Sequence, residues 1–385
     1  MRTISLLGST GSIGRQSLDV IAACGASVAA ITANSSVEML EEQARRFHPA
    51  LAVCYDKAAA AELRLRLADT DVRVASGMEG LVEAATLPQA DTVITAVVGN
   101  VGLKPTLAAI RAHKRIALAN KETLVCAGEL VMRTAKECGA EIIPVDSEHS
   151  ALFQCIQGSA DHGEIKRLIL TCSGGPFFGK SREELKNYTR ADALKHPTWK
   201  MGAKITVDCA TLMNKGLEFI EAMRLYGVTP DQVDIAIHRQ SIVHSLVEFR
   251  DNAILAQLGV PDMRLPIQYA LTYPERREAV VEPLDLFSCP PLAFQRPDTE
   301  TFQCLKLALE CARKPGVACA VLNGANEAAV GLFLRDEIRF LEIGELVAGA
   351  LAAVPDGPAD TLEQILEADR AAREAVYALR GSHRR

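Results

Sequence analysis

The first fourteen residues constrain the fold of this chain more than any other stretch. Residues 3–7 form an apolar run, the string GSTGSIG follows, and an apolar-periodic segment runs from about residue 12 to residue 24. A strand, a glycine-rich turn and a helix in this order bring backbone N–H groups to a helix N-terminus, where a pyrophosphate binds. The stretch favours dinucleotide binding over a purely structural turn.

Strand-like and helical patterns alternate through the rest of the first 150 residues. Further strand-like runs lie at residues 27–32, 51–55, 92–98, 115–119 and 141–145, with helical patterns between them. This alternation is typical of a parallel, doubly wound sheet. We therefore predict an α/β protein with a Rossmann-like domain over residues 1–150.

The second strand-like run ends without the acidic residue that usually binds the ribose hydroxyl of NAD. Asn34, Ser35 and Ser36 follow it instead. Small hydroxyl and amide groups do not repel a 2′-phosphate, so this end of the strand favours NADP.

Polar residues follow two later strand-like runs. Asn120, Lys121 and Glu122 follow the run at 115–119, and Asp146, Ser147 and Glu148 follow the run at 141–145. Ligands bind at the carboxyl ends of strands in such sheets, so the position of Lys121 favours contact with a substrate over the alternative of an ordinary surface lysine. In an extended segment Asp146 and Glu148 face the same way and can hold a cation, although two solvated acids in a loop give the same sequence.

The pattern changes after Phe153. Strand-like runs flanking the turn at residues 250–252 predict an α+β domain with antiparallel pairing over residues 151–272. A polar, irregular stretch at about 179–203 contains the only tryptophan, Trp199, which favours a lid over the substrate rather than an anchored surface loop. Dense prolines predict an extended linker at 273–299, and amphipathic patterns predict a helical domain at 300–385.

Three polar residues of the second domain share one face of a predicted helix. Asn214, Lys215 and Glu218 are spaced by three and four residues. They suit a site that holds a phosphate and a metal together. A simple ion pair between Lys215 and Glu218 explains the spacing equally well.

Composition excludes several partners. The net charge of −6 gives no general attraction to nucleic acid or to an anionic membrane, and no apolar run is long enough to span a bilayer. The eleven cysteines are scattered singly, which indicates reduced thiols and a cytoplasmic protein.

Seven strings, in this order and spacing, resemble the 1-deoxy-D-xylulose 5-phosphate reductoisomerase family: GSTGSIG, ALANKETLV, PVDSEHSALFQ, SGGPFF, HPTWKMG, ATLMNKGLE and QLGVPDMRLPIQYAL. The resemblance extends over essentially the whole chain. It implies a homodimeric enzyme that uses NADPH and Mg²⁺ or Mn²⁺ to rearrange 1-deoxyxylulose 5-phosphate and to reduce the resulting aldehyde to 2-C-methylerythritol 4-phosphate, in the non-mevalonate isoprenoid pathway.

The resemblance also implies roles for individual residues. The metal ligands would be Asp146, Glu148 and Glu218, and Lys121 and Ser147 would position the substrate's oxygens. The phosphate end would be held by Ser173, His196, Cys209, Asn214 and Lys215. The cofactor would be lined by Thr10, Gly11, Ser12, Ile13, Asn34, Ser35, Ser36, Asn120, Glu122 and Gly202. The implied catalytic set comprises Lys121, Asp146, Glu148, His196 and Glu218.

The chain departs from the family's usual pattern at three places. Cys209 stands where a serine is usual, and Asn34 and Ser35 stand where a glycine and a basic residue are common. Arg239 replaces a proline that is common after His238, and the sequence gives no account of its effect.

Two other functions fit part of the pattern. An NAD(P)-dependent dehydrogenase of sugars or semialdehydes would have the same N-terminal half but would not need the three carboxylates. A nucleotide-sensing regulator would bind NADPH without consuming it.

Overall fold

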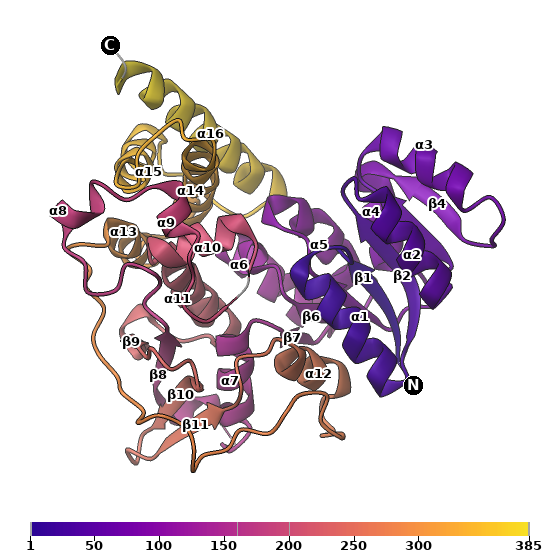
Figure 1. The fold of residues 1–385 in the computed structure, drawn as a ribbon, viewed down its shortest axis with the longest axis horizontal. Helices are drawn as coiled ribbons and strands as arrows, with labels where there is room; N and C mark the ends of the chain where they lie inside the picture. The colour runs from indigo at the N-terminus through magenta and orange to yellow at the C-terminus, as the bar shows by residue number, and fades with distance from the viewer. Residues whose placement is uncertain (1, 160, 200, 384–385) are drawn as a thin grey trace. The chain divides into compact units, whose positions relative to one another are not determined.

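The structure is a computed structural model that describes residues 2–159, 161–199 and 201–383 (Figure 1). Lys200 of the predicted lid and the last two residues of the predicted C-terminal domain lie outside the described residues. The chain forms two compact units. The first comprises residues 1–123, 131–150 and 262–282, and the second comprises residues 124–130, 151–261 and 283–385.

The first unit is built on a parallel seven-stranded sheet, with strand order β4-β3-β2-β1-β5-β6-β7. Its strands are β1 (Thr3–Leu7), β2 (Ser27–Ala33), β3 (Leu51–Cys54), β4 (Arg73–Ser76), β5 (Thr92–Thr95), β6 (Arg115–Leu118) and β7 (Ile142–Pro144). The predicted doubly wound α/β fold is confirmed. The sequence pattern missed β4, because this short edge strand has no fully buried residue and therefore no strong apolar signal.

Helices connect the strands of this sheet. They are α1 (Ser12–Cys24), α2 (Val37–Phe47), α3 (Lys57–Arg66), α4 (Gly77–Thr86), the 3-10 turn η1 (Gly99–Gly102), α5 (Leu103–Arg111) and α6 (Lys121–Cys138). A later helix, α12 (Arg264–Thr272), returns to this unit and packs against α1.

The turn from β1 into α1 needs glycine at two positions. Gly8 has φ +89°, a left-handed conformation that side chains disfavour. A Cβ on Gly14 would lie 2.1 Å from the carbonyl oxygen of Gly8, so only glycine lets the helix start this close to the strand. A buried hydrogen bond from Ser9 Oγ to Gln43 Oε1 (2.6 Å) fixes the turn from the side of α2.

The second unit contains a four-stranded mixed sheet with strand order β11-β10-β8-β9. Its strands are β8 (Ile165–Cys172), β9 (Val233–Ile237), β10 (Val243–Phe249) and β11 (Ile254–Leu258). The antiparallel pairing predicted from the turn at 250–252 is present between β10 and β11, but β8 and β9 are parallel. A parallel pair needs a long crossover, and the long segment between these two strands, which includes the helices α10 (Ala203–Ala210) and α11 (Met213–Tyr226), provides it.

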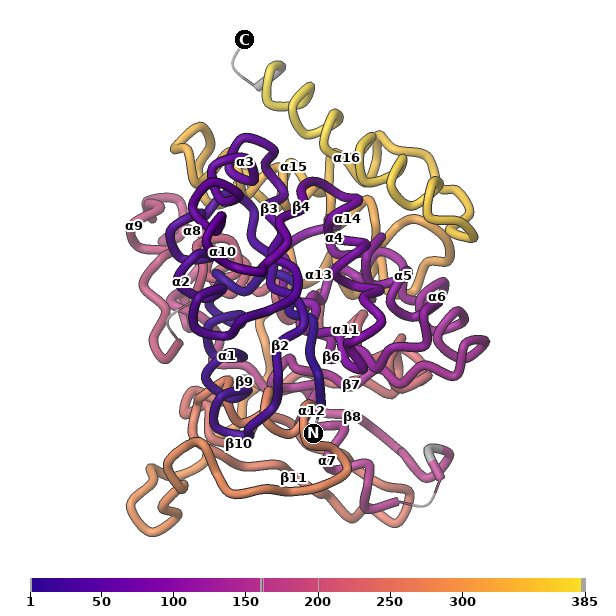
Figure 2. The backbone as a smooth tube through the Cα atoms, turned by 90° about the vertical axis from the view of Figure 1, so that its right-hand side faces the viewer, coloured from indigo at the N-terminus to yellow at the C-terminus, as the bar shows by residue number. Residues whose placement is uncertain are grey.

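The helices of this unit include α7 (Ser147–Ile156), which begins in the first unit, and the 3-10 turns η2 (His162–Glu164) and η3 (Pro230–Gln232). The others are α8 (Arg182–Leu185), α9 (Arg190–Ala193), α10 (Ala203–Ala210), α11 (Met213–Tyr226), α13 (Gln303–Cys311), α14 (Ala318–Leu334), α15 (Glu342–Ala353) and α16 (Leu362–His383). The last three pack on one another, and Figure 2 shows α16 extending to the C-terminus. The predicted helical C-terminal region is therefore present.

Two predicted irregular segments have some regular structure. The stretch at 179–203 contains the one-turn helices α8 and α9, each started by a capping box. The proline-rich linker is extended, and Gln295 forms an antiparallel bridge with Ile237 at the end of β9. No helix among the described residues has the length and apolar character needed to cross a membrane.

Candidate active site

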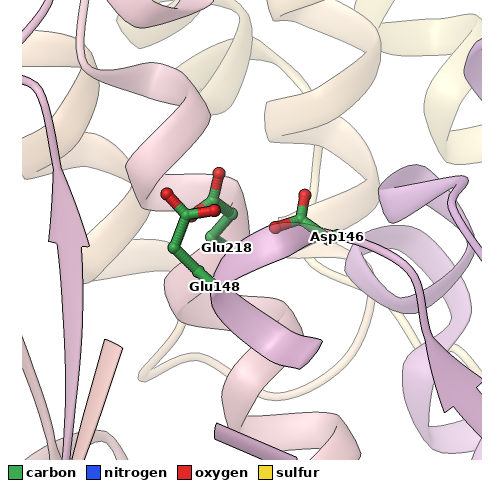
Figure 3. A group of neighbouring side chains, drawn as sticks. All are labelled: Asp146, Glu148 and Glu218. Carbon is green, nitrogen blue, oxygen red and sulfur yellow. The ribbon is translucent and has the colours of Figure 1, made fainter. Parts of the chain in front are cut away.

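Glu218 of α11 lies close to two carboxylates at the start of α7, although α7 and α11 are far apart in the sequence. Oxygen atoms of Asp146, Glu148 and Glu218 lie within 4.8 Å of one another, and Glu218 is buried (Figure 3). Three negative charges at this spacing repel one another unless a cation lies among them. An all-oxygen set of carboxylates suits a hard divalent ion such as Mg²⁺ or Mn²⁺ better than it suits zinc.

Asp146 and Glu148 come together for a different reason from the one predicted. Ser147 already begins α7, so the two acids do not lie on an extended segment. The carbonyl oxygen of Asp146 accepts a hydrogen bond from the backbone N–H of Ser150 (2.8 Å), which places Asp146 at the start of the helix. Both carboxylates thus lie at a helix N-terminus, where negative charge is favoured.

Lys121 lies beside this acidic group. Its Nζ is 3.0 Å from Oδ2 of Asp146, and both side chains are largely buried. The lysine is the first residue of α6, directly after β6, so the sheet edge fixes its backbone. An ammonium beside this carboxylate can also donate a hydrogen bond to an anionic oxygen.

Asn120 has a mainly internal role. Its Nδ2 donates to the carbonyl oxygens of Val97 (2.9 Å) and Gly99 (3.1 Å) and to Oε2 of Glu122 (2.8 Å). Its Oδ1 accepts from the backbone N–H of Thr123 (3.2 Å). The side chain therefore fixes the loop after β5 and caps α6, while a direct contact with the cofactor stays a prediction.

The other predicted cofactor residues lie at two places in the first unit. Thr10, Gly11, Ser12 and Ile13 form the turn into α1, and all four are at least partly exposed. Asn34, Ser35 and Ser36 are exposed at the carboxyl end of β2, the strand next to β1. Gly202, in the second unit, is the N-cap of α10 and is exposed.

The loop after β8 brings Ser173 to His196. Ser173 Oγ is 3.1 Å from Nε2 of His196 and accepts a hydrogen bond from the backbone N–H of Gly175 (3.2 Å). Nδ1 of His196 accepts from the backbone N–H groups of Thr198 (3.2 Å) and Trp199 (2.9 Å). Because Nδ1 accepts, the proton lies on Nε2, which donates to Ser173.

His196 is neutral over the physiological pH range. Desolvation by burial, and to a smaller extent the positive charge of Arg239, lower the pKa of His196 to about 4. A neutral imidazole offers a hydrogen bond to an anion but no net charge.

The remaining predicted phosphate residues lie on α10 and at the start of α11. Cys209 is partly exposed near the end of α10, and Leu212, with φ +60°, turns the chain into α11. Asn214 Nδ2 donates to Oε1 of Glu218 (2.5 Å), and Lys215 Nζ donates to Oε2 of the same carboxylate. Lys215 and Glu218 therefore form the ion pair, and Glu218 also belongs to the acidic group, while a site that holds a phosphate and a metal together stays a prediction.

Sequence reasoning missed two groups of contacts in the second unit, one around Asp208 and one around Arg239. Asn326 of α14 donates to Oδ1 of the buried Asp208 on α10 (2.8 Å), and Lys204 pairs with the same residue (2.9 Å). Arg239 donates to two carbonyl oxygens of the loop that carries Ser173. None of these residues lies in a phosphate- or metal-binding motif, so only their distances could identify them.

Two further histidines of the second unit, His238 and His244, differ from His196. His238 Nε2 accepts from the backbone N–H groups of Ile242 (3.2 Å) and Val243 (3.1 Å), and its Nδ1 donates to the carbonyl oxygen of Ala293 (3.0 Å). This imidazole therefore ties the linker to the sheet. The ring of His244 lies 6.4 Å from that of Trp199, and burial lowers the pKa of His244.

Three family models match the chain. They describe 1-deoxy-D-xylulose 5-phosphate reductoisomerase over residues 4–128 and its C-terminal domains over residues 142–226 and 258–375. A relative of that name from Lachnospira eligens is 51% identical over 377 residues, covering 98% of this chain and 99% of the relative. The relative of the same name from Symbiobacterium thermophilum is 54% identical over 379 residues, covering 97% of both chains.

Solved structures agree with these matches. A DOX-P reductoisomerase in complex with NADPH, fosmidomycin and magnesium is 42% identical, with a TM-score of 0.95 and coverage of 100% of both chains. The Zymomonas mobilis 1-deoxy-D-xylulose 5-phosphate reductoisomerase in complex with NADPH is also 42% identical, with a TM-score of 0.92 and coverage of 98% of this chain and 99% of that chain.

Proposed function

The chain belongs to the 1-deoxy-D-xylulose 5-phosphate reductoisomerase family, and from this premise we propose how its residues carry out the reaction. It is an NADP-dependent oxidoreductase that converts 1-deoxy-D-xylulose 5-phosphate to 2-C-methyl-D-erythritol 4-phosphate with NADPH and a divalent metal ion. The observation that carries the assignment to residues is the meeting of Asp146, Glu148 and Glu218.

These three carboxylates are the metal ligands. When bound, the ion balances negative charge on the substrate's oxygens while the carbon skeleton rearranges, and NADPH supplies the hydride that reduces the aldehyde. Lys121 contributes a second positive charge on the Asp146 side, 3.0 Å from that carboxylate. Lys121 and Ser147 orient the substrate's carbonyl and hydroxyl oxygens by hydrogen bonds.

The phosphate end of the substrate binds to residues of the second unit. Ser173 and the neutral His196 offer hydrogen bonds, and Lys215 offers a positive charge. Cys209 and Asn214 complete this set, which lies on α10, on α11, in the loop after β8 and in the segment between α9 and α10. A phosphate group held here anchors the substrate by a part of the molecule that does not react, so its binding energy is available for positioning.

NADPH binds to the first unit through the turn into α1 and the end of β2. The residues are those named above, from Thr10 to Ile13 and from Asn34 to Ser36, with Asn120 and Glu122. The stretch at 179–203 acts as a lid, and Gly202 within it contacts the cofactor. Binding of the phosphate beside His196 would order this lid and exclude water before hydride transfer.

We assign a separate role to each of four segments of the chain. Residues 1–150 bind NADPH, residues 151–272 form the catalytic and dimerisation domain, and residues 273–299 link it to the helical domain at 300–385.

The enzyme is a homodimer formed through the second unit. The linker covers the edge strand β9 through the bridge between Ile237 and Gln295, but β11 lies at the opposite edge of the sheet with Ile254 50% and Leu255 42% exposed. Phe287 of the linker is fully exposed as well. An exposed apolar edge strand and an exposed aromatic side chain in the same unit support burial against a second copy. The scattered, unbridged cysteines support a cytoplasmic location.

The reaction is tested by following absorbance at the nicotinamide band with 1-deoxyxylulose 5-phosphate and Mg²⁺. NADPH is expected to be consumed, and a chelator is expected to stop its consumption until Mg²⁺ is restored. Turnover that survives removal of the metal would favour a dehydrogenase of sugars or semialdehydes. Binding of NADPH without consumption would favour a regulator.

A further inference from the structure

Arg239 links the strand end at β9 to the loop after β8. Its Nη1 donates hydrogen bonds to the carbonyl oxygens of Ser173 (2.9 Å) and Gly175 (2.8 Å). Its Cζ lies 5.0 Å from the centre of the Phe178 ring, a cation–π distance. The guanidinium is therefore fixed by three contacts with residues 173–178, although Arg239 itself is exposed.

The loop that Arg239 contacts has an unusual backbone. Gly174 and Gly175 are both left-handed, with φ +77° and +67°. A Cβ on Gly175 would lie 2.4 Å from the carbonyl oxygen of Cys209, so the loop also passes close to α10. Glycine loses much conformational freedom when it is ordered, so two successive glycines need external contacts to keep one conformation.

The conformation of this loop decides where two phosphate-binding groups lie. Ser173 Oγ accepts hydrogen bonds from the backbone N–H of Gly175 and from the Nε2–H group of His196. Movement of the Ser173 or Gly175 carbonyl would move this hydroxyl and the imidazole with it. Arg239 Nη1 opposes such movement, because it donates a hydrogen bond to each of the two carbonyl oxygens.

The charge of Arg239 is also available to an anion. Within the described residues, no carboxylate lies within ion-pair distance of its guanidinium. The positive charge acts on His196, where it helps to lower the pKa. It therefore adds a favourable field to a part of the protein where the substrate phosphate would lie.

We propose that Arg239 is a positioning residue for the phosphate end of the substrate, because it holds the Ser173–Gly175 loop in the binding conformation and adds positive charge beside it. This inference rests on the assignment of Ser173 and His196 to the phosphate under the proposed function. It accounts for the arginine at a position where the family commonly has proline, which carries no side-chain donor.

Two substitutions separate the hydrogen bonds from the charge. Arg239→Gln removes the charge and the fork of donors, whereas Arg239→Lys keeps the charge but not the fork. Arg250→Gln is the matched control, because Arg250 is an exposed arginine in the β10–β11 turn of the same unit. A thermal melt establishes that each variant is folded.

The first measurement is binding of inorganic phosphate to the full-length protein, followed by the fluorescence of the single tryptophan. Trp199 reports on the site because its backbone N–H donates to Nδ1 of His196. We expect the Kd for phosphate to rise about tenfold in Arg239→Gln and by a smaller factor in Arg239→Lys, since charged hydrogen bonds to the loop are lost. Arg250→Gln should leave the Kd unchanged.

The second measurement is steady-state turnover. For Arg239→Gln the KM for 1-deoxyxylulose 5-phosphate should rise by the same factor as the phosphate Kd, while kcat and the KM for NADPH stay within about twofold. Unchanged phosphate affinity and unchanged KM in folded Arg239→Gln would overturn the inference, as would a loss confined to kcat.

The two proposals fail differently. If the wild-type protein does not turn over the substrate, the proposed function is wrong, and the phosphate titration alone decides the role of Arg239. If the wild-type protein turns over normally and Arg239→Gln matches Arg250→Gln in every measurement, only the role of Arg239 is wrong. Should Arg239→Gln fail to fold, Arg239→Lys carries the same comparison.

Discussion

Lys215 and Glu218 lie one turn apart on α11, and the ammonium of Lys215 donates a hydrogen bond to the carboxylate of Glu218. Each side chain is only 2% exposed. The same carboxylate accepts from Asn214 and belongs to the acidic group with Asp146 and Glu148. One helical turn thus joins the proposed phosphate-binding residues to a proposed metal ligand, so the two ends of a bound substrate are placed by one rigid element.

Glu218→Gln should weaken metal binding. The Mg²⁺ concentration that gives half-maximal activity is expected to rise by roughly two orders of magnitude, because one of three anionic ligands is lost. The variant should also lose about 2 kcal/mol of stability, since Lys215 loses a buried charged partner, so activity is measured well below its melting temperature. Glu221→Gln on the same helix is the control, and an equal change in Mg²⁺ requirement in both variants would argue against the assignment.

Gly14→Ala should destabilise the first unit much more than Gly11→Ala. The new Cβ at position 14 would lie 2.1 Å from the Gly8 carbonyl oxygen, whereas at position 11 it would lie 3.6 Å from the same atom. Overpacking of this kind costs about 3 kcal/mol, while Gly11→Ala at the N-cap should cost less than about 1 kcal/mol. Urea unfolding measures both, and similar losses would contradict the steric explanation.

His196 should make stability depend on pH between about 4 and 6.5. Its pKa is about 4 in the folded protein, against an ordinary value of 6.5, so in this window the unfolded chain binds a proton that the folded protein does not. Stability is therefore lost as the pH falls through this window.

The measurement is the melting temperature of wild type and of His196→Gln at several pH values. Wild type should lose more stability than the variant between pH 6.5 and pH 4. Nearby acids with a lowered pKa, Glu184 and Asp192, contribute equally to both proteins and cancel in the difference. Parallel curves would mean that His196 is protonated normally in the folded state.

Cys209→Ser should tighten binding of the substrate. A hydroxyl is a stronger hydrogen-bond donor than a thiol, so the phosphate should be held more tightly by about 1 kcal/mol, which lowers KM about fivefold. Cys138→Ser, at the end of α6, should leave KM unchanged. An unchanged KM in Cys209→Ser would show that residue 209 does not bind the phosphate.

Asn34 and Ser35 should give a preference for NADPH that is less steep than that of relatives with a basic residue there. The preference is measured as the ratio of kcat/KM with NADPH to kcat/KM with NADH. Asn34→Asp should lower the ratio at least about tenfold, because a carboxylate at the exposed end of β2 repels a 2′-phosphate. An unchanged ratio in Asn34→Asp would mean that the 2′-phosphate does not bind beside residue 34.

The local pattern of the sequence predicted most of the elements. Apolar periodicity identified six of the seven strands of the first sheet, the antiparallel strands β10 and β11 of the second sheet and the helical C-terminal region, because each has a face whose burial is encoded by neighbouring residues. It missed β4, which is short and lies at the sheet edge with partly exposed side chains. The sequence pattern also wrongly predicted an extended segment at residues 146–148, because α7 already begins at Ser147.

The candidate site was predictable as a set of residues but not as a geometry. The sequence by itself determined which groups are available, because the glycine turn, the acidic pair after β7 and the Asn-Lys-Glu spacing on α11 are local patterns. Only the tertiary structure decided that Glu218 meets Asp146 and Glu148, that backbone donors fix the tautomer of His196, and that Arg239 joins two carbonyls of a distant loop. These relationships arise from packing between segments far apart in the chain, and no periodicity in the sequence records a distance of that kind.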